Sequence, residues 1–147
     1  MGEVVFKDGK RVSARGVIIY RDSVYLMFRR KKKKDGSFKE YFVVPGGGIE
    51  AGEDEITALK REMEEELCID VKVLDKIGVD EKDETIANYY SLKILDGKPT
   101  LGGEEKEKSC EDNYYEIKLI KIKDLDDLDV DGKEFILEAY NKKHKKD

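Results

Sequence analysis

Two neighbouring segments of the chain carry the β-branched and aromatic residues that are typical of strands. They are residues 11–20, RVSARGVIIY, and residues 23–30, SVYLMFRR, in which apolar positions alternate with polar ones or cluster. The polar stretch RDS connects them. Because two such runs with a short polar connection are typical of a hairpin, we expect an antiparallel strand pair here.

Similar patterns continue downstream. KKKKDGS predicts a loop, KEYFVV predicts a strand that stops at Pro45, and the three glycines from Gly46 to Gly48 are expected to break regular structure. Further strands are predicted at residues 71–79, 86–95 and 113–122, and a closing amphipathic helix at residues 131–143. There is no repeat and no linker, so we expect a single α/β domain over residues 1–147.

The strongest helical pattern covers residues 52–67, GEDEITALKREMEEEL. Asp54 is the expected N-cap, and Glu53 and Glu55 lie near the positive end of the helix dipole. At about 100° per residue, four apolar side chains fall in a sector roughly 80° wide, which predicts the face that packs on a sheet: Ile56, Leu59, Met63 and Leu67.

Acidic residues crowd the second half of this helix. Glu62, Glu65 and Glu66 fall in a separate sector centred about 110° from the apolar one, whereas Glu64 points elsewhere and is expected to be solvated. Like charges one helical turn apart repel each other. A divalent cation within reach would turn that repulsion into shared coordination; the alternative is a solvated acidic face.

The segment before the helix, PGGGIEAGE, makes the metal site the better interpretation. Glycine has no Cβ, so its backbone can approach a bound phosphate or metal closely. The glycine loop and the acidic helix together predict a cradle for a metal-bound polyphosphate.

Composition restricts the class of protein. Of the 147 residues 43% are charged, yet the net charge is only −5 because lysines and acids are interspersed, which argues against a dedicated nucleic-acid or membrane-binding surface. No apolar run approaches the roughly 20 residues that span a bilayer. Cys68 and Cys110 follow no metal-ligand spacing, and residues 1–10 lack the apolar core of a signal peptide, so we expect a reduced, cytoplasmic protein.

The single histidine, His144, lies in the polar run NKKHKKD. A histidine-based metal site or a Ser-His triad is therefore nearly excluded. A metal would be held mainly by oxygen, which favours hard ions such as Mg²⁺ or Mn²⁺.

Residues 47–69 resemble the signature of the Nudix hydrolases. The signature runs Gly, five residues, Glu, seven residues, Arg-Glu-apolar-any-Glu-Glu-any-Gly-apolar, and the matching residues are Gly47, Glu53, Arg61, Glu62, Met63, Glu65, Glu66 and Ile69. Cys68 stands where the family has its late glycine. The resemblance implies the family's fold, an α/β/α sandwich around a mixed β-sheet.

The resemblance also implies the metal site. Glu62, Glu65 and Glu66 would bind Mg²⁺ or Mn²⁺ beside the backbone carbonyl of Gly46. Glu62, or a carboxylate from a later loop, would help to deprotonate the attacking water.

Two further pairs of residues receive roles. Gly47 and Gly48 belong to the glycine loop, so they are our candidates for contact with the substrate phosphates. The resemblance implies that Glu53 and Arg61 form an ion pair that orients the loop against the helix.

Cys68 departs from the family's pattern. If the helix ends there in a left-handed cap, as at the family's glycine, the cysteine costs about 1 kcal/mol of strain; the alternative is a slightly different exit from the helix. A small buried side chain is a better interpretation than a catalytic thiol, because no histidine or other evident base accompanies it.

A later segment, LGGEEKEKSCEDNYYEI, carries acids in a predicted loop: Glu104, Glu105, Glu107 and Glu111. Members of the family often draw an extra ligand or base from such a place. Glu105 is our first choice for that group, and the alternative for each acid is a solvated side chain.

The basic run RRKKKK predicts an exposed hairpin tip. Its alternative gives Arg29 a contact with substrate phosphates and the lysines a role in steering a polyanion. Tyr20, Tyr41 and Phe42 are either core residues or a surface on which a base stacks.

The expected function is metal-dependent hydrolysis of a pyrophosphate bond in a nucleoside diphosphate linked to another moiety. The short chain favours a MutT-like nucleoside triphosphate pyrophosphatase. The alternatives are an ADP-ribose, ADP-sugar or dinucleotide pyrophosphatase, and a nucleotide-sensing Nudix domain without turnover, against which the intact set of three glutamates argues. We expect a nucleotide as the small-molecule substrate, no membrane or stable nucleic-acid partner, and a monomer or homodimer.

Overall fold

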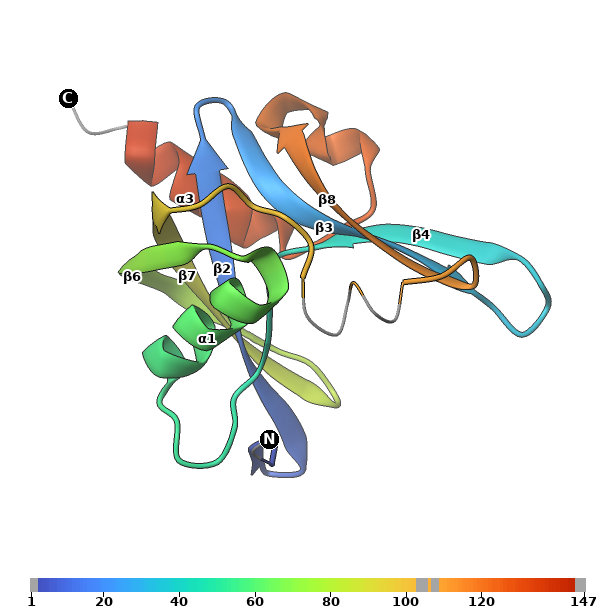
Figure 1. The fold of residues 1–147 in the computed structure, drawn as a ribbon, viewed down its shortest axis with the longest axis horizontal. Helices are drawn as coiled ribbons and strands as arrows, with labels where there is room; N and C mark the ends of the chain where they lie inside the picture. Colours follow the sequence, from blue (N-terminus) through green and yellow to red (C-terminus); the bar gives the residue numbers. More distant parts are fainter. Residues whose placement is uncertain (1–2, 103–105, 107–108, 145–147) are drawn as a thin grey trace.

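The computed structural model describes residues 3–102, 106 and 109–144. Its framework begins with the predicted hairpin of β2 (Lys10–Tyr20) and β3 (Ser23–Lys32). These strands pair next to the turn, at Ile19–Val24 and Tyr20–Ser23. Beyond those pairs β2 and β3 take different partners, so the hairpin joins the two halves of one mixed sheet (Figure 1).

In the first half, β2 runs parallel to β7 (Thr85–Asp96), and β7 is antiparallel to β6 (Asp70–Glu81). Two short strands, β1 (Phe6–Lys7) and β5 (Gly46–Gly48), pair with β2 in antiparallel fashion. In the second half, β3 lies between β4 (Phe38–Val43) and β8 (Asn113–Lys121), and β9 (Val130–Asp131) is parallel to β4. The strand order is therefore β6-β7-β2-β3-β4-β9, with β1, β5 and β8 off this path.

Helices cover both faces of this sheet. The first is α1 (Glu55–Leu67), and the chain closes with the 3-10 helix η1 (Ile122–Asp127) and with α3 (Lys133–His144). In Figure 1, α1 lies in front of the sheet and α3 behind it. The arrangement confirms the predicted α/β/α sandwich around a mixed sheet.

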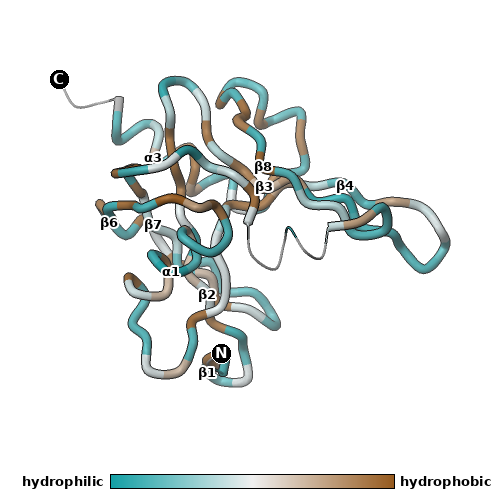
Figure 2. Tube along the Cα trace, in the orientation of Figure 1, coloured by the Kyte–Doolittle hydropathy of each residue, from teal (hydrophilic) through white to brown (hydrophobic). Residues whose placement is uncertain are grey.

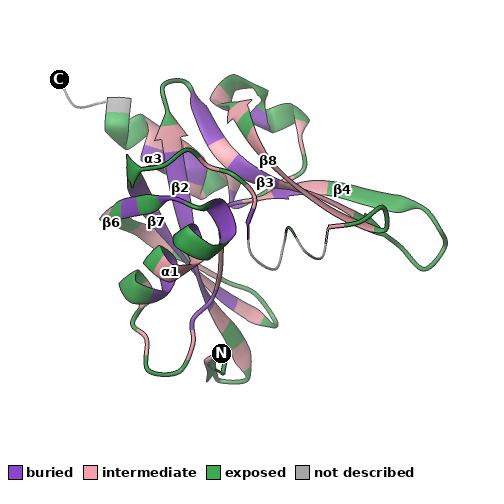
Figure 3. Ribbon diagram, viewed as in Figure 1, coloured by how far each residue is buried: buried purple, intermediate pink, exposed green. Residues whose placement is uncertain are grey.

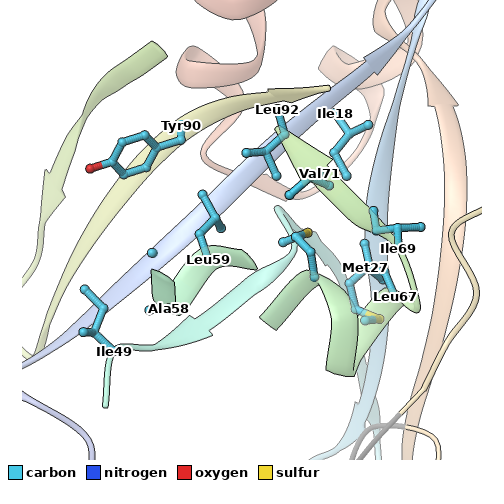
Figure 4. Packing of buried hydrophobic residues seen from close by; sticks show 12 residues of the cluster. Ile18, Met27, Ile49, Ala58, Leu59, Leu67, Ile69, Val71, Tyr90 and Leu92 are labelled. Carbon is cyan, nitrogen blue, oxygen red and sulfur yellow. The ribbon is translucent and has the colours of Figure 1, made fainter. Parts of the chain in front are cut away.

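Side-chain alternation along β2 explains the two layers, because successive side chains of a strand point to opposite faces. Ala14 and Ile18 pack with the apolar face of α1 in one buried cluster (Figure 4), whereas Val17 belongs to a second cluster that includes Ile136 of α3. Figure 2 shows apolar segments along the central strands, and Figure 3 shows that the outer part of β4 is exposed. Among the described residues, no helix is long and apolar enough to cross a membrane.

Two predictions about local structure are wrong. The three glycines do not break the sheet but form β5, paired with residues 13–15 of β2. Ile56 is 46% exposed, and the buried face of α1 consists of Ala58, Leu59, Met63, Glu66 and Leu67. At about 100° per residue this face is centred about 45° from the predicted one, on the side of the glutamates.

The remaining differences concern element boundaries and short elements. β3 continues into Lys32, so part of the predicted lysine loop is strand, and β4 ends at Val43. The sequence patterns did not predict β1, β9 or η1, each of which has two to six residues.

Candidate active site

The candidate site is built on α1, whose two ends are fixed by local hydrogen bonds. Asp54 is the N-cap, as predicted: its side chain accepts a 2.7 Å hydrogen bond from the backbone N–H of Thr57, which lowers the pKa of this carboxyl group. At the other end Cys68 adopts a left-handed conformation with φ 59° and ψ 37°. The left-handed cap that the resemblance suggested is therefore present, although the Cys68 side chain is exposed and not buried as predicted.

Arg61 is the hub of the site. Its Nε and NH2 atoms donate to the two carboxylate oxygens of Glu53, at 2.7 and 2.9 Å, so the predicted ion pair is bidentate. NH2 also donates to the carbonyl oxygen of Gly48 at 3.1 Å. NH1 donates to Glu62 Oε1 at 3.0 Å and to Glu65 Oε2 at 3.2 Å. One guanidinium thus joins the glycine segment, the loop and the glutamates of the helix.

The electrostatics follow from these contacts. The hydrogen bonds of Arg61 hold the pKa of Glu53 below its ordinary value of 4.5, more strongly than partial burial raises it. The same contacts, with Glu53 first and Glu62 next, raise the pKa of Arg61 above its usual range. Both groups are charged at neutral pH, and each is largely shielded from solvent, with side-chain exposures of 20% for Arg61 and 15% for Glu53.

The glycine strand lies directly against the helix. In β5, Gly47 pairs with Ala14 of β2. A Cβ built on Gly47 would lie 2.6 to 2.7 Å from the carboxylate atoms of Glu62, closer than real Cβ contacts allow. The absence of a side chain at position 47 is therefore what admits the Glu62 carboxylate to this place.

Gly46 is constrained by its own backbone. Its φ of 151° lies in the region that L side chains rarely adopt, and a Cβ there would clash with the carbonyl oxygen of Ala14. The Gly46 carbonyl accepts a long hydrogen bond, 3.4 Å, from Arg15 NH1. Its function as a metal ligand stays a prediction.

The three glutamates of α1 occupy different environments. Glu66 is buried, with 5% of its surface exposed, whereas the side chain of Glu62 is 16% exposed and that of Glu65 is 59% exposed. Glu64 is exposed, as predicted. The carboxylates therefore form a gradient from the core side of the helix to solvent, and do not share one solvated face.

Comparison with known proteins identifies the family of this chain. A sequence profile of the NUDIX domain matches residues 10–138, which is most of the chain. The chain belongs to the NUDIX domain family. The match confirms the resemblance to the Nudix hydrolases carried by residues 47–69.

Relatives and solved structures agree with this Nudix assignment. The ADP-ribose pyrophosphatase of Methanocaldococcus jannaschii is 32% identical over 96 residues, which cover 61% of this chain and 55% of that protein. The chain thus spans little more than half the length of that relative. The fold resembles the MutT NUDIX hydrolase of Burkholderia pseudomallei, with 22% identity, coverage of 79% of this chain and 86% of that chain, and a TM-score of 0.61. It also resembles an ADP-ribose pyrophosphatase of Streptococcus suis, with 14% identity, 92% and 93% coverage, and a TM-score of 0.63.

Nudix hydrolases generally use divalent metal ions, and the donors on α1 have the chemistry that such ions prefer, since Glu62, Glu65 and Glu66 offer only carboxylate oxygens. Within residues 3–102, 106 and 109–144, however, no group of three or more His, Cys, Asp or Glu side chains is arranged as a ready metal site. Arg61 NH1 bonds both Glu62 and Glu65. The chemistry of the donor set fits a hard cation, and Arg61 holds two of the three carboxylates in position.

The predicted ligand or base from the later loop falls mostly beyond the described residues. Glu104, Glu105 and Glu107 lie outside them. Glu111 is described and exposed, in the turn before β8. The described flank of this loop reaches the end of α1, where the backbone N–H of Gly102 donates to the Glu66 carbonyl at 2.8 Å.

Arg29 lies on the same face of the sheet as α1, at an internal position of β3. Its guanidinium lies over Tyr115, with Cζ 4.0 Å from the ring centroid, and Cζ is 5.9 Å from the centroid of the Tyr41 ring. NH2 donates to Asn113 Oδ1 at 2.9 Å. The cluster of Arg29, Tyr41, Asn113 and Tyr115 is called the arginine platform below.

The other two aromatic residues proposed to stack on a base, Phe42 and Tyr20, lie away from the arginine platform. Phe42 is buried in the cluster on the α3 side, so it is a core residue and does not belong to the arginine platform. Tyr20 is 48% exposed beside Arg21, at the other end of β2 from the residues that pair with the glycines. The lysines at the tip, Lys33 and Lys34, are exposed, as the hairpin interpretation predicts.

Sequence reasoning missed Glu50. Its carboxylate lies 3.6 Å from Arg61 NH1, and its backbone N–H donates to Glu53 Oε1 at 3.0 Å. Glu50 and Glu53 are three residues apart in the same loop, a spacing that brings both toward one cation once the loop turns at Gly52. The segment GIEAGE contains both glutamates, but the role of Glu50 can be recognised only once the position of Arg61 is known.

Proposed function

We propose that the protein hydrolyses a pyrophosphate bond in a nucleoside diphosphate linked to another moiety, and that it requires Mg²⁺ or Mn²⁺. The observation that carries the proposal is the contact between Gly47 and the Glu62 carboxylate, beside the Arg61 hub. Because Gly47 has no side chain, the Glu62 carboxylate lies directly against the glycine strand, so a cation held by Glu62 would lie close to that backbone. A solvated acidic helix would have no use for that arrangement.

The metal would be held by Glu62, Glu65 and Glu66. When bound, the cation would neutralise charge on the pyrophosphate oxygens and lower the pKa of a water molecule. The residues of the chain do the rest: Arg61 sets the positions of Glu62 and Glu65, and Glu53 fixes Arg61 from the opposite side. Glu62 is our candidate for accepting a proton from the attacking water, with Glu105 as the alternative.

Substrate binding is assigned to two places. Gly47 and Gly48 present backbone to the phosphates, and Gly46 offers its carbonyl to the metal. Arg29 offers a guanidinium stacked on Tyr115, so it can meet an anionic oxygen or the face of a base.

Two substrate classes are candidates. ADP-ribose is favoured by the relative with 32% identity, whose name describes that activity. A nucleoside triphosphate, the first choice from the sequence, is the second candidate. Both contain a nucleoside diphosphate, and the glutamates and the glycine strand would act on that shared part.

The test is hydrolysis of a panel by protein stripped of metal with EDTA and then supplied with Mg²⁺, Mn²⁺ or neither. The panel contains ADP-ribose, the dNTPs, NADH and diadenosine polyphosphates, and release of phosphate, pyrophosphate or nucleoside monophosphate is measured. We expect turnover of at least one compound with either metal and none without. Metal-independent turnover would contradict the proposal, and tight nucleotide binding without any turnover would favour a sensor.

Glu66→Gln tests the metal site. Glu64→Gln is the matched control, because Glu64 lies on the same helix but is exposed. Glu66→Gln should lower turnover by about 100-fold and weaken Mn²⁺ binding, read from the electron paramagnetic resonance signal of free Mn²⁺. Glu64→Gln should change neither. Equal Mn²⁺ binding by both variants would refute the assignment of Glu66 as a ligand.

A further inference from the structure

A large open pocket lies where β2 and β7 part. The two strands pair in parallel from Arg11–Thr85 to Ile18–Leu92. Beyond these pairs β2 turns to β3, whereas β7 stays with β6. The gap between the diverging strands has a volume of about 1120 Å³, and α3 and residues 97–99 contribute to its walls.

The pocket is separate from the candidate active site. β2 contributes residues 13–15 to the glycine strand at one end and residues 17–20 to the pocket at the other. None of the glutamates of α1, Arg61 or the arginine platform lines it. A ligand in this pocket would therefore be held by residues that the hydrolytic chemistry does not use.

Irregular pairing in β6 shapes one wall. The register with β7 shifts between Val73 and Asp75 and again between Lys76 and Gly78. The residues passed over, Leu74 and Ile77, both line the pocket. Bulges of this kind re-aim side chains, and here they place two apolar groups at the same opening.

The interior of the pocket is apolar. Three of its lining residues are buried, each with 5% exposure or less: Ile18 and Leu92 on the α1 face of the sheet, and Val17 on the α3 face. Leu74, in contrast, is 49% exposed at the rim. The apolar body of a ligand would cover this leucine and displace water from it.

The rim carries positive charge on an acidic protein. Five lysines and two acids line the pocket, a balance of +3 (5 − 2), whereas the whole chain has a net charge of −5. Those residues are Lys76, Lys93, Lys98, Lys142, Lys143, Asp75 and Glu138.

The lysines differ in their partners. Lys142 pairs with Asp75 at 3.3 Å, and Lys76 pairs with Glu55 at 2.9 Å. Lys93 and Lys98 are exposed and form no ion pair with any residue that the structure describes. These two lysines are the positive charges best placed to meet a ligand.

We infer that this pocket is a second binding site, for an amphipathic organic anion with an apolar or aromatic body and a phosphate, sulfonate or carboxylate group. The apolar lining residues, with Leu74 at the rim, would hold the body, and Lys93 and Lys98 would hold the anionic end. The volume of about 1120 Å³ is slightly above the range that small-molecule sites use, about 300–1,000 Å³, so a ligand the size of a mononucleotide can enter.

The test uses anilinonaphthalene sulfonate, an aromatic anion without a pyrophosphate bond. Its binding to the folded protein is followed by fluorescence titration, and its location by shifts of backbone amide signals in nuclear magnetic resonance spectra. We expect saturable binding at one site, with the largest shifts at residues 17–20, 74–77, 91–94 and 97–99. Shifts centred on residues 46–48 and 61–66 would overturn the inference.

A matched pair of double variants separates the pocket from the overall charge. Lys93→Glu with Lys98→Glu should raise the dissociation constant by about tenfold or more. Lys33→Glu with Lys34→Glu makes the same change of charge at the exposed hairpin tip and should leave the dissociation constant within about twofold. Equal weakening by both pairs, or no saturable binding by the unmodified protein, would also overturn the inference.

Discussion

Arg61 and Glu53 are joined by two parallel hydrogen bonds, of 2.7 and 2.9 Å, across the junction between the glycine loop and α1. Arg61 NH2 also bonds the Gly48 carbonyl, so a single side chain connects three pieces of backbone. Bidentate pairs of this type fix direction as well as distance. The position of the helix glutamates relative to the glycine strand therefore depends on this pair.

Glu53→Gln should lower the free energy of unfolding. The change removes one charge of a bidentate pair that is mostly shielded from solvent, and hydrogen bonds to charged groups contribute about 1.5–3 kcal/mol each. Urea unfolding followed by circular dichroism measures the difference. Glu81→Gln is the control, because Glu81 forms a single ion pair with Lys10 at a side-chain exposure of 58%, and it should have a much smaller effect. Equal losses in the two variants would contradict the importance of the Arg61 pair.

The contribution of Glu53 should also depend on pH. Its pKa in the folded protein is lowered from the ordinary 4.5, so the folded state binds the proton less tightly than the unfolded state. The stabilisation is therefore fully present above the unfolded pKa and is lost as the pH falls through the folded pKa. The difference in unfolding free energy between the unmodified protein and Glu53→Gln should be constant near neutral pH and shrink below about pH 4.5. A difference that grows on acidification would contradict the sign of this shift.

Gly47→Ala should damage the site and spare the fold. The added Cβ would meet the Glu62 carboxylate at 2.6 to 2.7 Å, and that carboxylate is the far end of a flexible side chain that can move away. We expect a nearly unchanged unfolding midpoint but a loss of about 10- to 100-fold in Mn²⁺ affinity or turnover.

Gly36→Ala is the control, and it should show the opposite pattern: a loss of stability without a loss of Mn²⁺ affinity. Gly36 has a φ of 89° and nothing within 4 Å of a built Cβ, in a loop remote in sequence from the glutamates. Alanine there should cost about 1 kcal/mol of stability through the backbone alone and leave Mn²⁺ affinity unchanged. If Gly47→Ala behaves like Gly36→Ala, the close approach at Glu62 has no function.

The sequence predicted the parts of the site that local interactions determine. Asp54 caps α1 through a side chain that reaches three residues ahead, so neighbouring residues are enough to predict this cap. The left-handed end of the helix at Cys68 is different, because only the resemblance to the family suggested it and the sequence left another exit open. The glycine strand is different. Gly46 to Gly48 pair with residues 13–15, more than thirty positions earlier, and glycine has little preference for strands, so no local pattern could reveal β5.

The exposure of Ile56 and the burial of Glu66 have the same origin. A helical wheel gives the relative angles of side chains but not the direction from which the sheet approaches. β5 lies against Glu62, which turns the buried face toward the glutamates. Only the tertiary contact determines which edge of the apolar stripe is covered.

Arg29→Lys should raise KM and leave kcat nearly unchanged. Lysine keeps the charge but loses the planar stacking on Tyr115 and the hydrogen bond to Asn113, so a substrate held by the arginine platform binds less well, by about tenfold. Steady-state kinetics with the substrate found in the panel measures both constants.

Arg30→Lys is the matched control for this change. Arg30 is the next residue of β3, so its side chain points to the opposite face, where it stacks near Phe38 and Tyr114 at 5.4 and 5.2 Å. The Arg30→Lys variant therefore loses a similar contact with aromatic rings, but on the face of the sheet opposite to α1. A rise in KM in both variants, or in neither, would mean that the arginine platform does not bind substrate.

Cys68→Gly should stabilise the protein without changing turnover. Cys68 has a φ of 59°, and its backbone N–H donates to the Glu64 carbonyl at 3.1 Å, so the cap is formed in spite of the strain on a residue with a Cβ. Glycine at this position removes about 1 kcal/mol of that strain, and denaturant unfolding should show an increase of this order. Cys68→Ala keeps the Cβ and the strained backbone while removing the thiol, so it should give no such gain. If alanine stabilises as much as glycine, the cost at this position comes from the sulfur, which lies against Gly102, and not from the left-handed backbone.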